Sequence, residues 1–167
     1  MRILGLLLLA LLLLTLEGAI CQLLHVGLLR PDPVLVLVVL LGLRGGAGSV
    51  MLVFGLGLLA DTFAGTPLGL LTIGYLLDWT LIRLVHRFVL SDSRLVQAGL
   101  VFGASAIAYL TLLAFLAGMP SVGAPISSIL AWTLPLALFN SLLARPIWAA
   151  GQRILGPQQR TALFAPR

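Results

Sequence analysis

Charged side chains are scarce in this chain of 167 residues. Only 9% of the residues are Asp, Glu, Lys or Arg, whereas 60% are hydrophobic. A soluble domain usually carries about a quarter charged residues. So few charges cannot cover a water-facing surface, which excludes an ordinary soluble domain. The composition indicates an integral membrane protein surrounded by a lipid bilayer.

Lysine is absent, and the ten basic residues are all arginine, with a formal net charge of +5. The arginines stand singly at the ends of apolar runs instead of forming a basic patch. That placement is typical of side chains that anchor helices at the membrane surface. The positive charge therefore gives no indication of a nucleic-acid partner.

Cysteine occurs once, as Cys21, so an internal disulfide framework is excluded. A lipoprotein modification site usually has a small residue just before the cysteine, but Ile20 stands there. We therefore interpret Cys21 as a small buried hydrophobic residue.

Catalytic and metal-binding motifs are also missing, because the sequence contains no HExxH, CxxC, Walker loop or GxSxG pattern. The two histidines, His25 and His86, are expected near opposite faces of the membrane. We predict no enzymatic activity, no metal and no cofactor.

Long hydrophobic runs divide the chain into six predicted helices, although a spanning helix needs roughly 20 apolar residues and two of the six are shorter. Asp32 and Pro33 form a helix start signal before the second, and Thr66 and Pro67 repeat that signal before the fourth. Pro135 predicts a kink in the last helix, which Arg145-Pro146 is expected to close. The expected ranges are Ile3 to Leu24, Val34 to Leu43, Ser49 to Phe63, Pro67 to Val89, Leu95 to Ala117, and Ile126 to Leu143.

The two short helices, the second and third, are expected to be tilted in a thinned region or packed against longer neighbours. The first hydrophobic run also fits a signal peptide, with Arg2 before the run from Ile3 to Leu16. Glu17-Gly18-Ala19 is, however, a poor cleavage site.

The arginines support six spans with both termini in the cytoplasm. In that topology only Arg30 lies outside, and the other nine of the ten arginines lie inside. Merging the second and third helices would place several arginines outside and Arg44 in the membrane core. We therefore predict an all-α, six-helix membrane domain at residues 1–146, followed at 147–167 by an interfacial or flexible cytoplasmic tail.

An aspartate, Asp61, stands in the aliphatic stretch that joins the third and fourth helices. The N-terminus of a helix presents unpaired amides and a positive dipole end. Asp61 is expected to fold back across the turn and accept hydrogen bonds from those amides, with Gly65 and Gly69 allowing close backbone approach. The alternatives are contact with a partner or ligand from the outer leaflet, or a role in proton or ion transfer.

Other polar residues fall inside predicted helices, namely Glu17, Asp78 and Asn140. Intramembrane carboxyl groups usually face the bundle interior or a partner. Small residues, as in the GxxxG pattern from Gly99 to Gly103, predict close helix packing. The candidate residues for structural or partner-binding roles are Glu17, Arg30, Asp32, Asp61, Thr66, Gly69 and Asp78.

The order of these signals resembles the rod shape-determining protein MreD family over residues 30–75. The matching elements are Arg30-Pro31-Asp32, an aliphatic run closed by Arg44-Gly45, then Asp61, the segment from Gly65 to Gly69, and Gly74-Tyr75. Chain length and the number of hydrophobic runs also fit the family over nearly the whole chain.

The resemblance implies a non-enzymatic scaffold of the bacterial inner membrane that supports peptidoglycan synthesis and rod shape within the elongation complex. The implied partners are an MreC-like single-pass membrane protein, a SEDS glycosyltransferase with a class B penicillin-binding protein, and indirectly the MreB filament. The family fold is similar to the substrate-binding subunit of energy-coupling-factor transporters. A vitamin-binding transporter subunit is therefore the main alternative, and a channel or proton relay through Glu17, Asp61 and Asp78 is a third.

Overall fold

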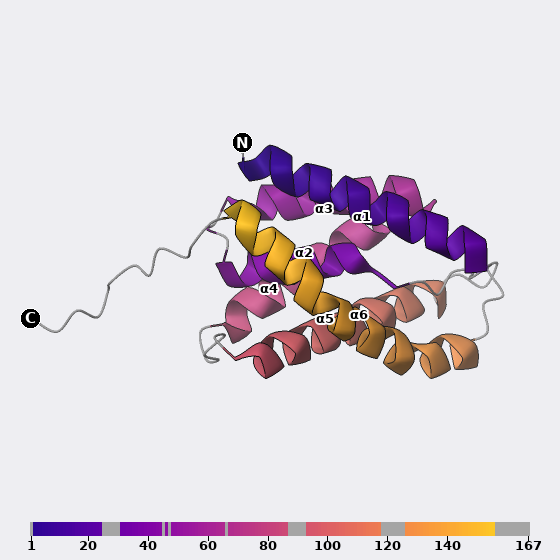
Figure 1. Ribbon diagram of the computed structural model, residues 1–167. Helices are drawn as coiled ribbons and strands as arrows, with labels where there is room; N and C mark the ends of the chain where they lie inside the picture. Colours follow the sequence, from indigo (N-terminus) through magenta and orange to yellow (C-terminus); the bar gives the residue numbers. More distant parts are fainter. Residues whose placement is uncertain are drawn as a thin grey trace, which may run out of the picture.

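The computed structural model describes residues 2–24, 31–44, 46, 48–65, 67–86, 93–117 and 126–155, which form six α-helices and no strand. Figure 1 shows them gathered into one bundle. Their bounds are α1 Arg2–Leu24, α2 Pro33–Arg44, α3 Ser49–Ala64, α4 Leu70–Val85, α5 Arg94–Ala117 and α6 Ile126–Leu155. The predicted all-helical fold and the existence of all six helices are confirmed.

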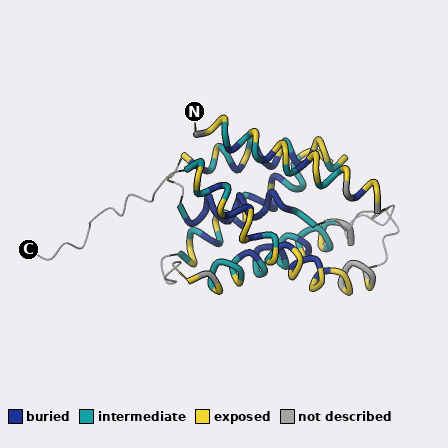
Figure 2. Tube along the Cα trace, in the orientation of Figure 1, coloured by how far each residue is buried: buried dark blue, intermediate teal, exposed yellow. Residues whose placement is uncertain are grey.

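The short helix α2 lies at the centre of the bundle and contacts each of the other five helices. Every residue from Pro33 to Leu43 is buried, and Figure 2 shows the dark blue trace of α2 inside the others. A helix that is apolar all round has this position because no face of it needs water. The short helices were expected either to tilt in a thinned region or to pack against longer neighbours, and α2 does the second.

The outer helices are apolar on their exposed surfaces as well. Among the described residues, large hydrophobic side chains such as Leu8, Met51, Phe54 and Leu134 are exposed. Two helices are long and apolar enough to cross a membrane, at Ile3–Leu23 and Leu95–Phe115, and only 18% and 22% of these segments are buried. Low burial distinguishes them from the core helices of a soluble protein.

The two ends of the described bundle lie together. A Cβ atom added to Gly5, near the start of α1, would lie 3.0 Å from Ile154, near the end of α6. Figure 1 shows the same proximity of the first turns of α1 and the last turns of α6. The chain thus enters and leaves the bundle at one end.

The helix α6 is longer than expected, and its predicted end at Arg145-Pro146 is wrong. Both Pro135 and Pro146 lie inside it, and it continues to Leu155. Proline removes one helical hydrogen bond, but Ile147 and Trp148 are buried in the core and hold the following turns in place. The predicted boundary between residues 146 and 147 therefore falls inside α6, and residues 156–167 lie outside the described part of the chain.

The helix α4 begins later than expected, at Leu70 instead of Pro67. Gly69 has a left-handed φ of 99°, which is incompatible with a helical turn. The N–H of Leu70 donates to the carbonyl oxygen of Pro67 at 3.1 Å and closes a turn before the helix. The expected end at Val89 lies outside the described residues.

Candidate functional site

Asp61 is buried, 1% exposed, near the end of α3, and its carboxylate receives hydrogen bonds from the start of α4. The N–H groups of Gly69 and Leu71 donate to Oδ2 and Oδ1, each at 2.8 Å. Thr72 donates to Oδ2 twice, from its hydroxyl at 2.7 Å and from its N–H at 3.3 Å. We call Asp61, Gly69, Leu71 and Thr72 the Asp61 clip.

The Asp61 clip has the geometry expected from the sequence, because Asp61 satisfies amides that open a helix. Gly69 is the N-cap residue of α4 and has no side chain to accept these bonds. Gly65, the C-cap residue of α3, has a φ of 63°, so the chain reverses between two left-handed glycines. An aspartate on the preceding helix thus provides the cap that the local sequence lacks.

A close approach of α3 and α4 brings Asp61 within reach. Gly57 lies one turn before Asp61, and a Cβ atom added to it would lie 2.5 Å from the Cα atom of Thr72. Only glycine fits at such a separation. Gly57 thus permits close helix packing, whereas Gly55, Gly99 and Gly103 have no described neighbour within 4 Å of an added Cβ atom.

A second polar cluster surrounds Asp32, at the start of α2. Its Oδ1 accepts from the N–H of Leu35 at 3.1 Å, which confirms the predicted N-cap. Its Oδ2 accepts from the Tyr75 hydroxyl of α4 at 2.6 Å, and its own N–H donates to Oδ1 of Asn140 on α6 at 3.0 Å. Three helices therefore meet at one aspartate.

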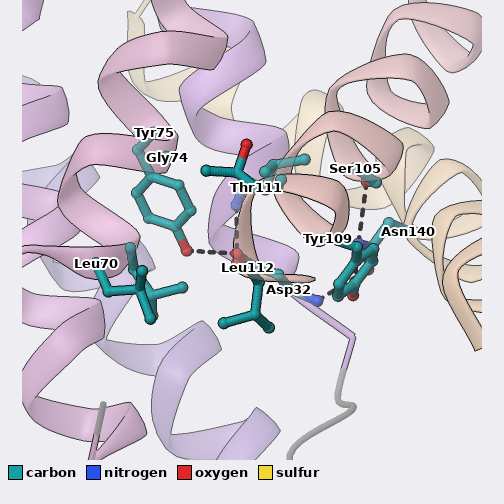
Figure 3. A pocket seen from close by; sticks show the side chains of 12 residues that line it. Asp32, Leu70, Gly74, Tyr75, Ser105, Tyr109, Thr111, Leu112 and Asn140 are labelled. Atoms are coloured by element: carbon teal, nitrogen blue, oxygen red, sulfur yellow. Dashed lines mark hydrogen bonds between the residues drawn. The ribbon is translucent and has the colours of Figure 1, made fainter. Parts of the chain in front are cut away.

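Asn140 extends this cluster to α5. Its Nδ2 donates to the Ser105 hydroxyl at 3.1 Å and contacts the Tyr109 hydroxyl at 3.5 Å. Asn140 and Ser105 are fully buried, so the amide uses its oxygen and nitrogen to join α2, α5 and α6. We call Asp32, Tyr75, Ser105, Tyr109 and Asn140 the Asp32 network, and Figure 3 shows its side chains converging.

A small cavity of about 50 Å³ lies beside the Asp32 network. Gly74 and Thr111 line it together with residues of the network (Figure 3). A cavity needs about 10 to 15 Å³ of such space to hold one water molecule, so this cavity has room for ordered water. Leu71 also lines the cavity, and the first two turns of α4 therefore connect it to the Asp61 clip.

The side chain of Asp78 takes part in neither of the two hydrogen-bonded clusters described above. It is 1% exposed, and neither carboxyl oxygen has a hydrogen-bond partner among the described residues. It lies one helical turn beyond Gly74 on α4, whereas Glu17 lies half-buried on α1. Asp78 is thus a buried polar group without the compensation that such groups usually have.

The structure brings Asp32, Asp61 and Gly69 to one end of the bundle. Arg30 and Thr66, the two remaining candidates, lie outside the described residues. The sequence analysis did not select Tyr75, Ser105 and Tyr109 as site residues. Tyr75 belongs to the Gly74-Tyr75 pair on which the resemblance partly rests. Ser105 and Tyr109 could have been selected because each places a hydroxyl group in an otherwise apolar helix.

The arginines of the described helices lie toward the opposite end from Asp32 and Asp61. Arg44 ends α2, Arg83 lies in the last turn of α4, Arg94 begins α5 and Arg153 lies in the last turn of α6. The contact of Gly5 with Ile154 adds the start of α1, with Arg2, to the same end. The bundle is therefore polarised, with a basic end and an end that carries the two clusters.

The two clusters join helices to one another through hydrogen bonds. Within the described part of the chain, no three His, Cys, Asp or Glu side chains are placed to hold a metal ion. Cys21 is buried, as expected. Comparisons with protein-family models, with curated proteins and with solved structures gave no match to this chain.

Proposed function

We propose that the chain is a multi-pass membrane protein that crosses the bilayer six times with both termini in the cytoplasm. Support comes from the two long apolar helices, which are mostly exposed, and from the apolar side chains on the outer surface. The shared location of the first and last described turns fits an even number of spans. The basic end fits the cytoplasmic side.

The first helix is a permanent part of the bundle in this proposal, not a cleaved leader. Leu6, Ala10 and Leu14 of α1 are buried in the common core. They recur at intervals of four residues and form one stripe along the helix. Removing α1 would expose α2, which α1 covers on that side.

Within the membrane, we propose that the protein is a non-enzymatic scaffold of the bacterial elongation complex, as the resemblance to the MreD family implies. One observation carries this proposal. The residues of the family-like pattern, Asp32, Asp61, Gly69 and Gly74-Tyr75, meet around the first turns of α4, although they are spread over 44 positions from 32 to 75. They define the shape of the end that faces a periplasmic, MreC-like partner.

The rival functions have less support. A pocket for a drug-sized ligand usually has a volume of about 300 to 1,000 Å³, and the cavity beside the Asp32 network has only about 50 Å³. This cavity is therefore too small for a vitamin. A proton relay through Asp61 is disfavoured because four donors already occupy its carboxylate.

Site-specific photocrosslinking in bacterial cells tests the scaffold. Leu68 lies in the α3–α4 turn and is 75% exposed, and Leu84, 56% exposed near the end of α4, provides a matched control at the basic end. We expect a crosslinker at position 68 to capture a single-pass membrane protein or a cell-wall synthase, and one at position 84 not to do so. Capture of no protein at position 68, or purification of the chain with a bound vitamin, would contradict the proposal.

A further inference from the structure

Arg145 differs in position from the other arginines of the described helices. Its place at the end of the last span was expected from the sequence, but α6 continues past it to Leu155. Arg153, in the last turn of α6, lies at the basic end instead. Arg145 is thus an arginine within the length of the bundle, about two turns before Arg153.

The contact between α1 and α6 fixes the level of Arg145 in the bundle. A Cβ atom added to Gly5 would lie 3.0 Å from Ile154, and Figure 1 shows the start of α1 next to the end of α6. A helix rises roughly 1.5 Å per residue, so Arg145 lies about 13 Å along α6 from Ile154. The apolar segment of α1, Ile3–Leu23, begins beside Ile154. In the proposed topology Arg145 is therefore at the level of the hydrocarbon and not of the headgroups.

The side chain of Arg145 is exposed on a face of α6 that is otherwise apolar. Leu138 and Leu142 are 56% and 67% exposed, and Pro146 and Ala149 are exposed as well. These residues follow the spacing of three and four positions that marks one face of a helix. The opposite face of the same turns is part of the common core. Arg145 therefore faces the surroundings of the bundle and not its interior.

The charge of Arg145 is uncompensated within the described part of the chain. Arg145 forms no hydrogen bond or ion pair with a described residue, and the described carboxyl groups belong to other segments. A guanidinium keeps its charge and has five N–H donors. Such a group is costly at the level of the hydrocarbon unless an acceptor pairs with it. The acceptor has to come from outside the described bundle.

Bending of the long side chain toward the membrane surface is the alternative explanation. The Cα–Cβ bonds of a helix tilt toward its N-terminus, and the N-terminus of α6 is at the end away from Arg153. Pro146 lacks an N–H group, so it cannot donate to the carbonyl oxygen of Leu142, four positions earlier. That oxygen belongs to the same exposed side of α6, and a backbone carbonyl cannot bend to the surface. Bending of Arg145 therefore leaves a polar group without a partner at this level.

We infer that the face of α6 around Arg145 binds a transmembrane helix of a partner protein that carries a carboxylate at the same depth. A carboxylate accepts two parallel hydrogen bonds from a guanidinium, and its charge compensates that of Arg145. The small side chain of Ala149, exposed one turn away, lets the backbone of the partner helix come close. This inference rests on the proposed topology and adds to the scaffold a contact inside the bilayer.

Association with model helices in vesicles tests the site. The full chain, with a donor dye on its N-terminal amine, is reconstituted in phosphatidylcholine with synthetic polyleucine helices that carry an acceptor dye and one central Glu or Gln. Energy transfer measures their association. We expect the parent to bind the Glu helix at least about fivefold more tightly than the Gln helix, and Arg145→Gln to lose that difference. A helix with its Glu at one end should bind like the Gln helix.

Arg153→Gln is the matched control, because it removes the same charge from an exposed position of α6 at the basic end. It should leave the preference for the Glu helix unchanged. An equal loss in both variants, or no preference in the parent, would overturn the inference. Displacement of the Glu helix when phosphatidylglycerol replaces phosphatidylcholine would also overturn it, since Arg145 would then bind lipid phosphate.

A measurement that keeps Arg145 covers the case in which Arg145→Gln does not fold. A spin label is attached to Leu142→Cys, 67% exposed in the parent, in a chain with Cys21→Ala. Dissolved oxygen should reach the label and a water-soluble nickel complex should not, and the Glu helix should reduce the access of oxygen more than the Gln helix. Access of the nickel complex, or equal effects of the two helices, would contradict the site. Because crosslinking at position 68 probes the other end, failure of this site is distinguishable from failure of the scaffold proposal.

Discussion

At the scale of single residues, Asp61 shows how an aspartate is accommodated in an apolar chain. A buried carboxylate is costly unless hydrogen bonds replace water. Gly69, Leu71 and Thr72 supply these bonds from the unpaired start of α4. The helix start and the carboxylate therefore compensate each other, and each would be unfavourable alone.

Replacing Asp61 tests this compensation. We expect Asp61→Ala to destabilise the protein by at least about 2 kcal/mol, because it leaves buried amides without an acceptor. Asp61→Asn keeps one acceptor oxygen and should cost less. Thermal unfolding in detergent, followed by circular dichroism, measures both. Equal stability of Asp61→Ala and the parent would show that the Asp61 clip contributes nothing.

Replacing Asp78 should raise stability, unlike replacing Asp61, because the Asp78 carboxyl group has no hydrogen-bond partner among the described residues. We expect Asp78→Leu to stabilise the bundle by about 1 to 3 kcal/mol, the usual cost of an unsatisfied buried polar group. The same unfolding measurement checks this expectation. Asp78→Asn, which keeps a polar side chain in the same place, is the control and should gain less. A loss of stability in Asp78→Leu would reveal a partner for the carboxyl group.

Tyr75 tests the Asp32 network. Tyr75→Phe removes the hydroxyl that donates to Asp32 at 2.6 Å, and a hydrogen bond to a charged group contributes about 1.5 to 3 kcal/mol. Tyr109→Phe removes a longer contact, at 3.5 Å from Asn140, and should cost less. The reverse order of the two unfolding temperatures would be inconsistent with the network as described.

At the scale of helices, the α3–α4 pair depends on Gly57. We expect Gly57→Ala to cost about 1 to 3 kcal/mol, since its methyl group would overlap the backbone of Thr72. Gly55→Ala places the same methyl group in open space and should be neutral or slightly stabilising. Unfolding curves of the two variants provide the comparison, and equal effects would contradict the close approach of α3 and α4.

The sequence predicted a helix well where an apolar run and a cap coincide, as at Asp32. It failed where tertiary packing decides, because Pro146 does not end α6 when the following turn is buried against α2. The start of α4 was misplaced because the φ angle of Gly69 cannot be read from its residue type.

The part of the candidate site that is local in sequence was predictable, and the part that joins distant helices was not. Asp61 and the amides that it binds are at most 11 positions apart, so local reasoning reached them. Tyr75 and Asp32 are 43 positions apart, and Asn140 and Asp32 are 108 apart. Such pairings depend on how helices are arranged around α2, which apolar periodicity alone does not specify.

At the scale of the whole molecule, the separation of the arginines from Asp32 and Asp61 predicts the orientation in the membrane. In a chain with Cys21→Ala, we expect Leu68→Cys to react with an impermeant maleimide added to intact cells whose outer membrane is permeable to it. Ser93→Cys, exposed at the start of α5, should react only after the inner membrane is opened. Labelling in the reverse pattern would contradict the proposed topology.

The complete enclosure of α2 also constrains how the molecule is assembled. A helix whose whole circumference is covered by protein has no surface that a lipid can solvate in the finished bundle. During synthesis α2 emerges long before α6, whose Gly151 finally meets Leu40. The early helices therefore remain loosely associated until α6 is made. The final buried core forms only when α6 packs against α2.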